Sequence, residues 1–305
     1  MKKRKKKRVR AAYPARGNMD VTGALIRCAL ACSLFIVAAG ALSVSGAYRV
    51  LPQWASMLIQ TALTVLCFGF PAVYGLLHAD GDQRAKIACQ AVSAQQLRWL
   101  GAAGVLLICP MTLLTDLISA PFVRMGIVSA GASAAPPFAL FVPMLVKSVL
   151  IAPACEELFF RGYLTAALRE AGSRCVMLIS ALFFALMHGV NAALVPRFLM
   201  GLLLGALVMR TDSLLAAVIV HAAYNLTVLL LSFVGLGGLF SGLGFLSCLI
   251  RVPLCAAFVL ALREACEARC ARRALRFGPP LTLRQKIALV FALIALIVCP
   301  LLMAG

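Results

Sequence analysis

Long apolar segments recur along the chain and alternate with short polar ones. Each apolar segment is long enough for an α-helix to cross a hydrocarbon layer about 30 Å thick. The alternating segments of about ten residues that form transmembrane β-barrels are absent from the sequence. The pattern therefore predicts an all-α fold, a polytopic transmembrane helical bundle of about eight or nine spans. We expect these spans at residues 25–46, 55–77, 99–119, 138–160, 175–190, 194–209, 213–234, 240–262 and 286–304.

The eighth of these spans is the least regular. It contains Arg251 and Pro253, and the stretch from Gly235 to Gly244 before it has the composition of a loop. A charged residue inside a membrane is costly and a proline interrupts helical hydrogen bonding. The number of spans depends on this segment.

Composition supports the membrane class and a simple domain organisation. Hydrophobic residues make up 63% of the chain and charged residues 13%, whereas soluble domains have about 45–50% apolar and about 25% charged residues. No polar segment is long enough for a soluble domain. We expect a basic tail at residues 1–20 and a single membrane domain at 21–305, with a catalytic core at about 140–230. Gly201 and Gly205, at helical spacing, predict a helix that approaches its neighbours closely.

The net charge of +19 is distributed unevenly between the two sides of the predicted bundle. Nine Lys and Arg residues lie within residues 1–20, and seven more lie in the range from Arg263 to Lys286. Both segments are predicted to lie on the same side of the membrane as the N-terminus. The opposite side has scattered ones, Arg49, Arg124 and Arg197. Basic residues concentrate on the cytoplasmic side of membrane proteins. The distribution predicts a cytoplasmic N-terminus in the cell (inner) membrane and argues against a nucleic-acid partner.

Two adjacent glutamates, Glu156 and Glu157, lie inside the fourth predicted span. The chain has only ten acidic residues, and an ionised carboxylate in a bilayer needs a partner or a function. Residues four apart share a helix face, so Glu157 can pair with Arg161, while Glu156 points about 100° away. A purely structural alternative makes both glutamates partners of Arg161 and other basic residues at the cytoplasmic boundary.

The fifth predicted span contributes His188. A tight turn at Gly172 and Ser173 joins it to the fourth span, and Glu156 and His188 lie about equally far from that turn. Two antiparallel helices joined there bring both side chains to a similar depth. Phe184, one turn before His188, is the expected packing neighbour of its ring. A single histidine in an apolar helix more often has a structural role. A histidine at the same depth as a buried glutamate is a candidate for a catalytic role.

The seventh span contributes His221 and Asn225, which share one helix face. Helical metalloprotease motifs use the same spacing to direct two ligands to one zinc ion. Asn is a poor zinc ligand, and its amide is better suited to donate hydrogen bonds to an oxyanion. Imidazole can bind a metal, act as a base or donate a hydrogen bond, so the spacing leaves these roles open.

Three motifs together resemble a known family. Glu156-Glu157-x-x-x-Arg161, then Phe184-x-x-x-His188, then His221-x-x-x-Asn225 occur in the order of the three motifs of the CPBP intramembrane proteases. That family includes the Abi proteins and the CaaX prenyl endopeptidases. The resemblance covers roughly residues 140–230. It implies an intramembrane endopeptidase, and peptide or protein substrates that enter from the membrane or the cytosol.

The resemblance also implies roles for the motif residues. Glu156 is expected to activate water that His188 orients, His221 and Asn225 to stabilise the oxyanion, and Glu157, paired with Arg161, to support Glu156. In a second version of the mechanism, zinc is the cofactor and Glu156, His188 and His221 bind it, since two histidines, a carboxylate and an open position suit catalytic zinc. Both versions remain open.

Other functional classes also remain open at this stage. A transporter or ion and proton pathway could use the same buried groups together with Asp116 and Lys147, although no duplicated halves are visible in the sequence. A non-catalytic membrane scaffold could keep the fold without cleaving anything. For a protease, the substrate could be of the CaaX type, or the enzyme could act in peptide maturation or immunity.

Overall fold

A computed structural model provides the fold. It describes residues 21–46, 50–79, 88–125, 135–168, 171–189, 191, 193–236, 240, 242–267 and 280–304. The predicted basic tail at residues 1–20 lies outside these ranges.

Every predicted span corresponds to a helix or to a continuous series of helical segments. The elements are α1 (Val21–Val44), α3 (Gln53–Thr64), η1 (Val65–Gly69), α4 (Phe70–Leu77), α6 (Ala94–Leu106), α7 (Ile108–Arg124), η2 (Phe138–Leu140), α8 (Phe141–Met144), η3 (Leu145–Ile151), α9 (Ala152–Glu157), η4 (Leu158–Leu164), α10 (Thr165–Leu168), α11 (Ser173–Leu186), α12 (Leu194–Thr211), α13 (Leu214–Val234), α14 (Phe245–Glu267) and α15 (Leu283–Ala304). Within the described residues, seven helical segments are long and apolar enough to cross a membrane, and α11 is a shorter apolar helix. The prediction of an all-α membrane bundle is confirmed.

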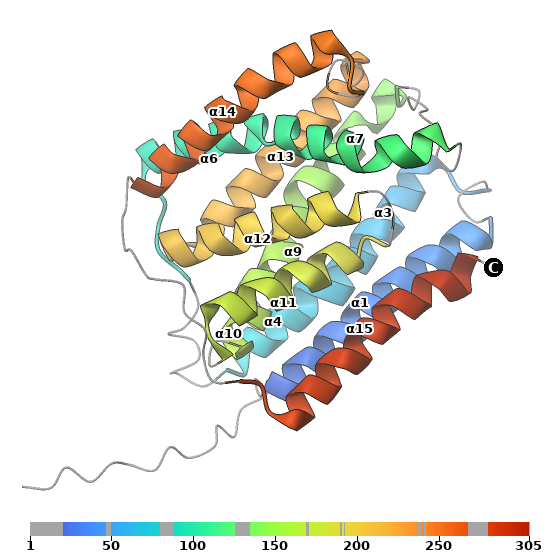
Figure 1. The fold of residues 1–305 in the computed structure, drawn as a ribbon. Helices are drawn as coiled ribbons and strands as arrows, with labels where there is room; N and C mark the ends of the chain where they lie inside the picture. The colour runs from blue at the N-terminus through green and yellow to red at the C-terminus, as the bar shows by residue number, and fades with distance from the viewer. Residues whose placement is uncertain are drawn as a thin grey trace, which may run out of the picture.

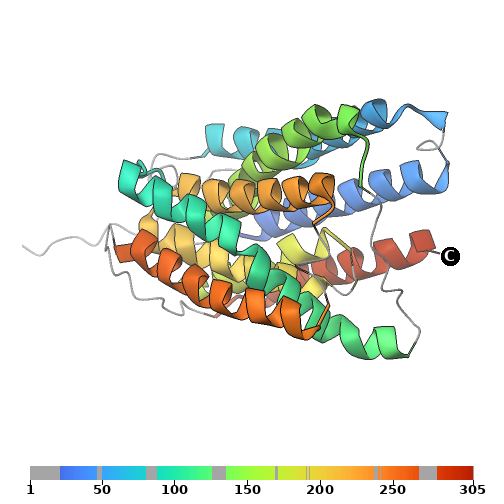
Figure 2. The same cartoon turned by 90° about the horizontal axis from the view of Figure 1, so that it is seen from above.

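The axes of the helices are roughly aligned with one another, as the view from above shows (Figure 2). Helices α1 and α15 lie side by side along one edge of the bundle (Figure 1). Helix α6 packs against α13 and α14, and α11 packs against α12. The helical series 138–168 therefore lies between these groups and contacts both α11 and α13.

Two buried apolar clusters hold the bundle together. The first joins α1, η1, η4, α11 and α15 around aromatic side chains that include Phe68, Phe159, Phe160 and Phe183. The second joins α6, α12, α13 and α14 around aliphatic side chains such as Leu100 and Val220. Helices η4 and α11 contribute to the first cluster and α13 to the second. The side chains that link these helices consequently lie where the two clusters meet.

Arg251, which made the eighth span irregular, is fully buried and bonded on every side. Its NH1 donates to Oδ2 of Asp116 on α7 at 2.6 Å, and other guanidinium N–H groups donate to the carbonyl oxygens of Phe240 and Gly242. Gly242 has a φ of +77° that favours glycine, and α14 begins only at Phe245. The charge of Arg251 thus fixes the preceding loop to the bundle and leaves the span intact.

Gly201 and Gly205 allow the close packing of α12 on α11 that the sequence predicts. A Cβ atom on Gly201 would lie 2.9 Å from the Cα atom of Ala181, and one on Gly205 would lie 3.0 Å from Cγ of Met177. Backbone atoms cannot move aside as a flexible side chain can. The expected close approach is confirmed, and Gly201 is the more restricted of the two positions.

We expect Gly201→Ala to destabilise the protein by about 1–3 kcal/mol, because the added methyl group overpacks the α11–α12 contact. Gly101→Ala is the matched control, since no atom lies within 4 Å of a Cβ there and alanine favours a helix over glycine by about 0.5–1 kcal/mol. Thermal unfolding in detergent measures both. Equal melting temperatures for the two variants would contradict the close packing.

Candidate active site

The helix that carries the two glutamates is irregular on both sides of them. The π-helical segments η3 and η4 flank α9, which contains Glu156 and Glu157. Pro153 has no N–H to donate to the carbonyl of Val149, and the π-helical turns of η3 end just before it. Such insertions widen a helix locally and are frequent at functional sites.

Glu157 forms the ion pair with Arg161 that the sequence predicts. Oε1 of Glu157 accepts a hydrogen bond from NH1 of Arg161 at 2.9 Å, and both side chains are buried, with exposures of 0% and 2%. NH2 of Arg161 donates to the carbonyl oxygen of Gly201 at 3.1 Å. The pair therefore links the glutamate helix to α12 at Gly201, the residue that also packs closely against Ala181 of α11.

The same carboxylate oxygen also contacts His221. Nδ1 of His221 lies 2.9 Å from Oε1 of Glu157, and the histidine is 4% exposed. Because an ionised carboxylate only accepts hydrogen bonds, Nδ1 of His221 is the donor, and its Nε2 faces away from Glu157. Glu157 thus connects the first motif to the third, which the sequence did not predict.

Phe184 connects the second motif to both others. Its ring centroid lies 5.0 Å from that of His188 and 5.7 Å from that of His221, with edge-to-face geometry in both cases. Cζ of Arg161 lies 4.5 Å from the same centroid, a cation–π contact. The expected packing of Phe184 on His188 is confirmed. One aromatic ring holds the two imidazoles and the guanidinium in place.

His188 has one ring nitrogen free for chemistry. Its Nδ1 lies 2.8 Å from the carbonyl oxygen of Phe184, which can only accept, so Nδ1 carries the hydrogen. Nε2 of the neutral ring is then an acceptor. A neutral imidazole in this tautomer can accept a hydrogen bond from water or bind a metal.

Asn225 is half-buried and hydrogen-bonded across the bundle. Its Nδ2 donates to the carbonyl oxygen of Ser148 in η3 at 2.7 Å. An amide nitrogen has two hydrogens, so one N–H of Asn225 is left for another acceptor. The carbonyl of Ser148 fixes where that second N–H points. No sequence pattern indicates a backbone partner of this kind.

Glu156 differs from Glu157 in taking part in no ion pair among the described residues, although both glutamates have a buried Oε2 atom without a hydrogen-bond partner there. It is 6% exposed, and its Oε2 atom has no hydrogen-bond partner among the described residues. Electrostatic interactions connect it to His221, Glu157, Arg161 and Lys147. A buried carboxylate oxygen without a partner is unfavourable unless a further group, such as water or substrate, completes the site.

The predicted zinc ligands Glu156, His188 and His221 do not form a metal-binding group in the described residues. Among the residues that the structure describes, no group of three His, Cys, Asp or Glu side chains is placed to hold a metal ion. Nδ1 of His221 is bonded to Glu157 and Nδ1 of His188 to a carbonyl oxygen, which leaves Nε2 of each ring as the nitrogen that could bind a metal. As the side chains lie here, Glu156, His188 and His221 do not fit a three-ligand zinc centre. Dependence on zinc stays a prediction.

Arg197 is a neighbour of the site that the sequence did not identify. It lies on α12, interacts electrostatically with His188 and Tyr224, and donates to Oδ1 of Asn191 at 3.0 Å. Its position near the end of an apolar segment suggested only an outer loop.

The chain matches one protein family. Residues 138–227 match the family described as type II CAAX prenyl endopeptidase Rce1-like. No curated protein and no solved structure matches the chain. The matched range begins at η2 and ends two residues beyond Asn225, so it includes all three motifs. The match confirms the resemblance to the CPBP and CaaX proteases over residues 138–227, and the apolar helices indicate an integral membrane protein.

Proposed function

We propose that the protein is an intramembrane endopeptidase in which Glu156 activates the attacking water. The observation that carries this proposal is the buried Oε2 atom of Glu156, which has no hydrogen-bond partner among the described residues, in a carboxylate that interacts electrostatically with His221 and Arg161. The match to an endopeptidase family supports the reaction class. Hydrolysis needs a base at this position because water itself is a weak nucleophile.

The proposed reaction uses Glu156 twice. Its carboxylate removes a proton from water while the water oxygen bonds to the carbonyl carbon of the peptide. When the C–N bond breaks, the protonated Glu156 gives that proton to the leaving amine. Nε2 of His188, as an acceptor, holds the second hydrogen of the water and so directs its lone pair toward the carbonyl. No step of this proposed reaction requires a metal.

Glu157 makes His221 suitable as an oxyanion partner. Nε2 of His221 can donate while Nδ1 donates to Glu157 only if both ring nitrogens carry a hydrogen. The ring is then positively charged, and the Glu157 carboxylate stabilises that charge. The second N–H of Asn225 is the other proposed donor. Positioned donors stabilise a developing oxyanion because they need no reorganisation during the reaction.

We propose a protein or peptide substrate that reaches the site from the bilayer or the cytosol. The name of the matched family points to substrates that end in a prenylated cysteine, two aliphatic residues and a variable residue. A peptide-maturation or immunity substrate is the other candidate. The uneven distribution of basic residues supports a cytoplasmic N-terminus in the cell (inner) membrane.

A transport function receives less support from the same residues. An ion pathway would need its charged groups to line one route. Asp116 is instead paired with Arg251 on α14, and Lys147 donates to Oε1 of Gln60 on α3. These two residues therefore have separate partners in separate parts of the bundle.

The test is a cleavage assay with purified protein in lipid nanodiscs. The probe is a quenched fluorescent peptide that ends in farnesyl-cysteine, valine, isoleucine and methionine, with an unprenylated copy beside it. We expect mass spectrometry to identify a new carboxylate at one peptide bond, and Glu156→Gln protein to produce none. Equal cleavage by the wild type and by this variant would overturn the role of Glu156.

Removal of metals is expected to leave the proposed reaction intact. Prolonged treatment with a zinc chelator should change kcat by less than about twofold, because protein side chains supply the base and the oxyanion donors. A known zinc protease treated in parallel controls for complete chelation. A loss of activity that added zinc restores would instead support the version in which Glu156, His188 and His221 bind zinc.

A further inference from the structure

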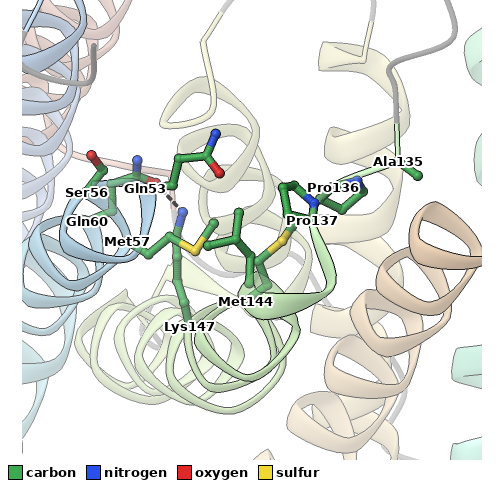
Figure 3. A pocket seen from close by; sticks show the side chains of 10 residues that line it. Gln53, Ser56, Met57, Gln60, Ala135, Pro136, Pro137, Met144 and Lys147 are labelled. Carbon is green, nitrogen blue, oxygen red and sulfur yellow. Dashed lines mark hydrogen bonds between the residues drawn. The ribbon is translucent and has the colours of Figure 1, made fainter. Parts of the chain in front are cut away.

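Arg197 and Lys147 are basic residues outside the three motifs, and each interacts electrostatically with a motif residue, Arg197 with His188 and Lys147 with Glu156. Lys147 lies in a pocket of about 540 Å³ between α3 and η3, where its Nζ donates to Oε1 of Gln60 (Figure 3). None of the residues that line this pocket belongs to a motif. Arg197 differs, because its contacts lead to the turn that carries His188 and to α13.

His188 lies at the very end of its helix. Helix α11 ends at Leu186, and the N–H groups of His188 and Gly189 donate to the carbonyl oxygens three residues before them, at 3.2 and 2.9 Å. Gly189 has a φ of +83°, in the region that favours glycine. The chain therefore leaves the helix directly after His188. The hydrogen bond of Nδ1 to Phe184 sets the tautomer of the ring, but the place of the ring also depends on how this turn is held.

Asn191 and Arg197 hold the turn against α12. Oδ1 of Asn191 accepts hydrogen bonds from the backbone N–H of Ala193 and from NH1 of Arg197, both at 3.0 Å. The carbonyl oxygen of Asn191 also accepts from the N–H of Leu194, the first residue of α12, at 2.9 Å. Arg197 thus supplies a side-chain contact between α12 and a residue three positions after His188.

Arg197 also interacts with α13. Its charge interacts electrostatically with Tyr224, the residue before Asn225, and Tyr224 packs against the second apolar cluster. None of the ion pairs among the described residues includes Arg197. A half-buried cation in a helix that is long and apolar enough to span a membrane is costly. Because its contacts join two segments that carry motif residues, this costly position points to a role in the site.

We propose that Arg197, acting through Asn191, is a positioning residue that holds His188 where its Nε2 can orient the attacking water. This inference rests on the proposed endopeptidase function. The planar guanidinium donates to Asn191 in a fixed geometry that a lysine ammonium on a flexible stem does not reproduce. A displacement of about 1 Å at a catalytic group can cost about 10²-fold in rate. A contact outside the motifs can therefore control the chemical step.

The kinetics of Arg197 and Asn191 variants test this role. In Arg197→Gln we expect kcat for the fluorescent peptide to fall by about 10-fold to 100-fold, with KM changed by less than about twofold, because the substrate still binds while the water is misdirected. Asn191→Ala should also lower kcat, and the double variant should be no slower than Asn191→Ala alone, because the contact is already lost. Arg197→Lys should recover part of the loss. Arg210→Gln, which removes an exposed arginine from the last turn of α12, should leave kcat unchanged.

A spectroscopic measurement makes the test independent of cleavage. The chain has three histidines, His78, His188 and His221, so solid-state NMR of protein with isotope-labelled histidine in lipid bilayers can follow each ring, and His188→Gln assigns one of them. We expect Arg197→Gln to shift the ring signals of His188 and to leave those of His78 and His221 in place. Arg210→Gln should shift none. If the protein cleaves nothing and the His188 signals still shift, the positioning of His188 is supported and the proposed function fails alone.

Three outcomes would overturn the proposal. Unchanged kcat and unchanged His188 signals in Arg197→Gln, with cleavage that still depends on Glu156, would remove the role of Arg197 and leave the proposed function standing. A higher KM with unchanged kcat would mean that Arg197 binds the substrate directly. A lower melting temperature together with shifted signals at all three histidines would make the arginine structural.

Discussion

Glu156→Gln is expected to lower kcat for peptide cleavage by about 10⁴-fold, close to the background of the assay. General bases contribute about 10²–10⁴-fold, and the upper end applies here because Glu157, the neighbouring carboxylate, is held through Oε1 by Arg161 and His221. Glutamine keeps the shape of the side chain and cannot remove a proton. The measurement is single-turnover cleavage of the fluorescent peptide.

The fold of the Glu156→Gln protein should be unaffected. Oε2 of Glu156 has no protein partner within the described residues, so the amide breaks no hydrogen bond at that atom, and the melting temperature should match the wild type. Asn225→Ala is the comparison on the catalytic side. It removes an oxyanion donor and keeps the base, so we expect a smaller loss of about 10²-fold. Equal losses for both variants would argue against separate roles.

Glu157→Gln should have the largest effect on stability. The substitution leaves the guanidinium of Arg161 buried without a counter-ion, and the loss of one partner of a buried pair costs about 3–5 kcal/mol. It also removes the carboxylate that orients His221. We expect a clearly lower melting temperature together with a loss of cleavage. Thermal unfolding and the peptide assay measure the two effects on the same preparation.

A double variant separates the two roles of Glu157. In Glu157→Gln with Arg161→Gln, no uncompensated charge remains at the pair, so much of the stability should return. His221 still lacks its carboxylate, and cleavage should stay low. Arg161→Gln alone keeps the Glu157–His221 contact and is the matched control. If the double variant regained cleavage along with its melting temperature, Glu157 would have a structural role only.

The sequence best predicted the structural features that depend on residues close together along the chain. Hydrophobic segment length predicted the spans, and spacing along one helix predicted the pairing of Glu157 with Arg161 and the contact of Phe184 with His188. Some local signals were missed. Ser93 and Gln96 form a capping box that starts α6 at Ala94, although the third span was expected only from residue 99.

The contacts between helices were beyond reach of the same reasoning. Glu157 and His221 are 64 residues apart, and their contact depends on how α9 docks against α13. Asn225 binds a backbone carbonyl, which every residue possesses and no residue type signals. Lys147 was grouped with Asp116 because both are charged residues inside predicted spans, whereas Asp116 binds Arg251 and Lys147 binds Gln60.

The pairing of α1 with α15 has a consequence for biogenesis. The ribosome releases α1 into the bilayer well before residues 283–304 are made, so α1 waits for its partner through most of translation. The buried surface of α1 holds small apolar residues such as Ala24, Cys28 and Cys32, which lipid tails solvate at little cost. The segment at 138–227 can thus enter the bundle before α15 packs against α1.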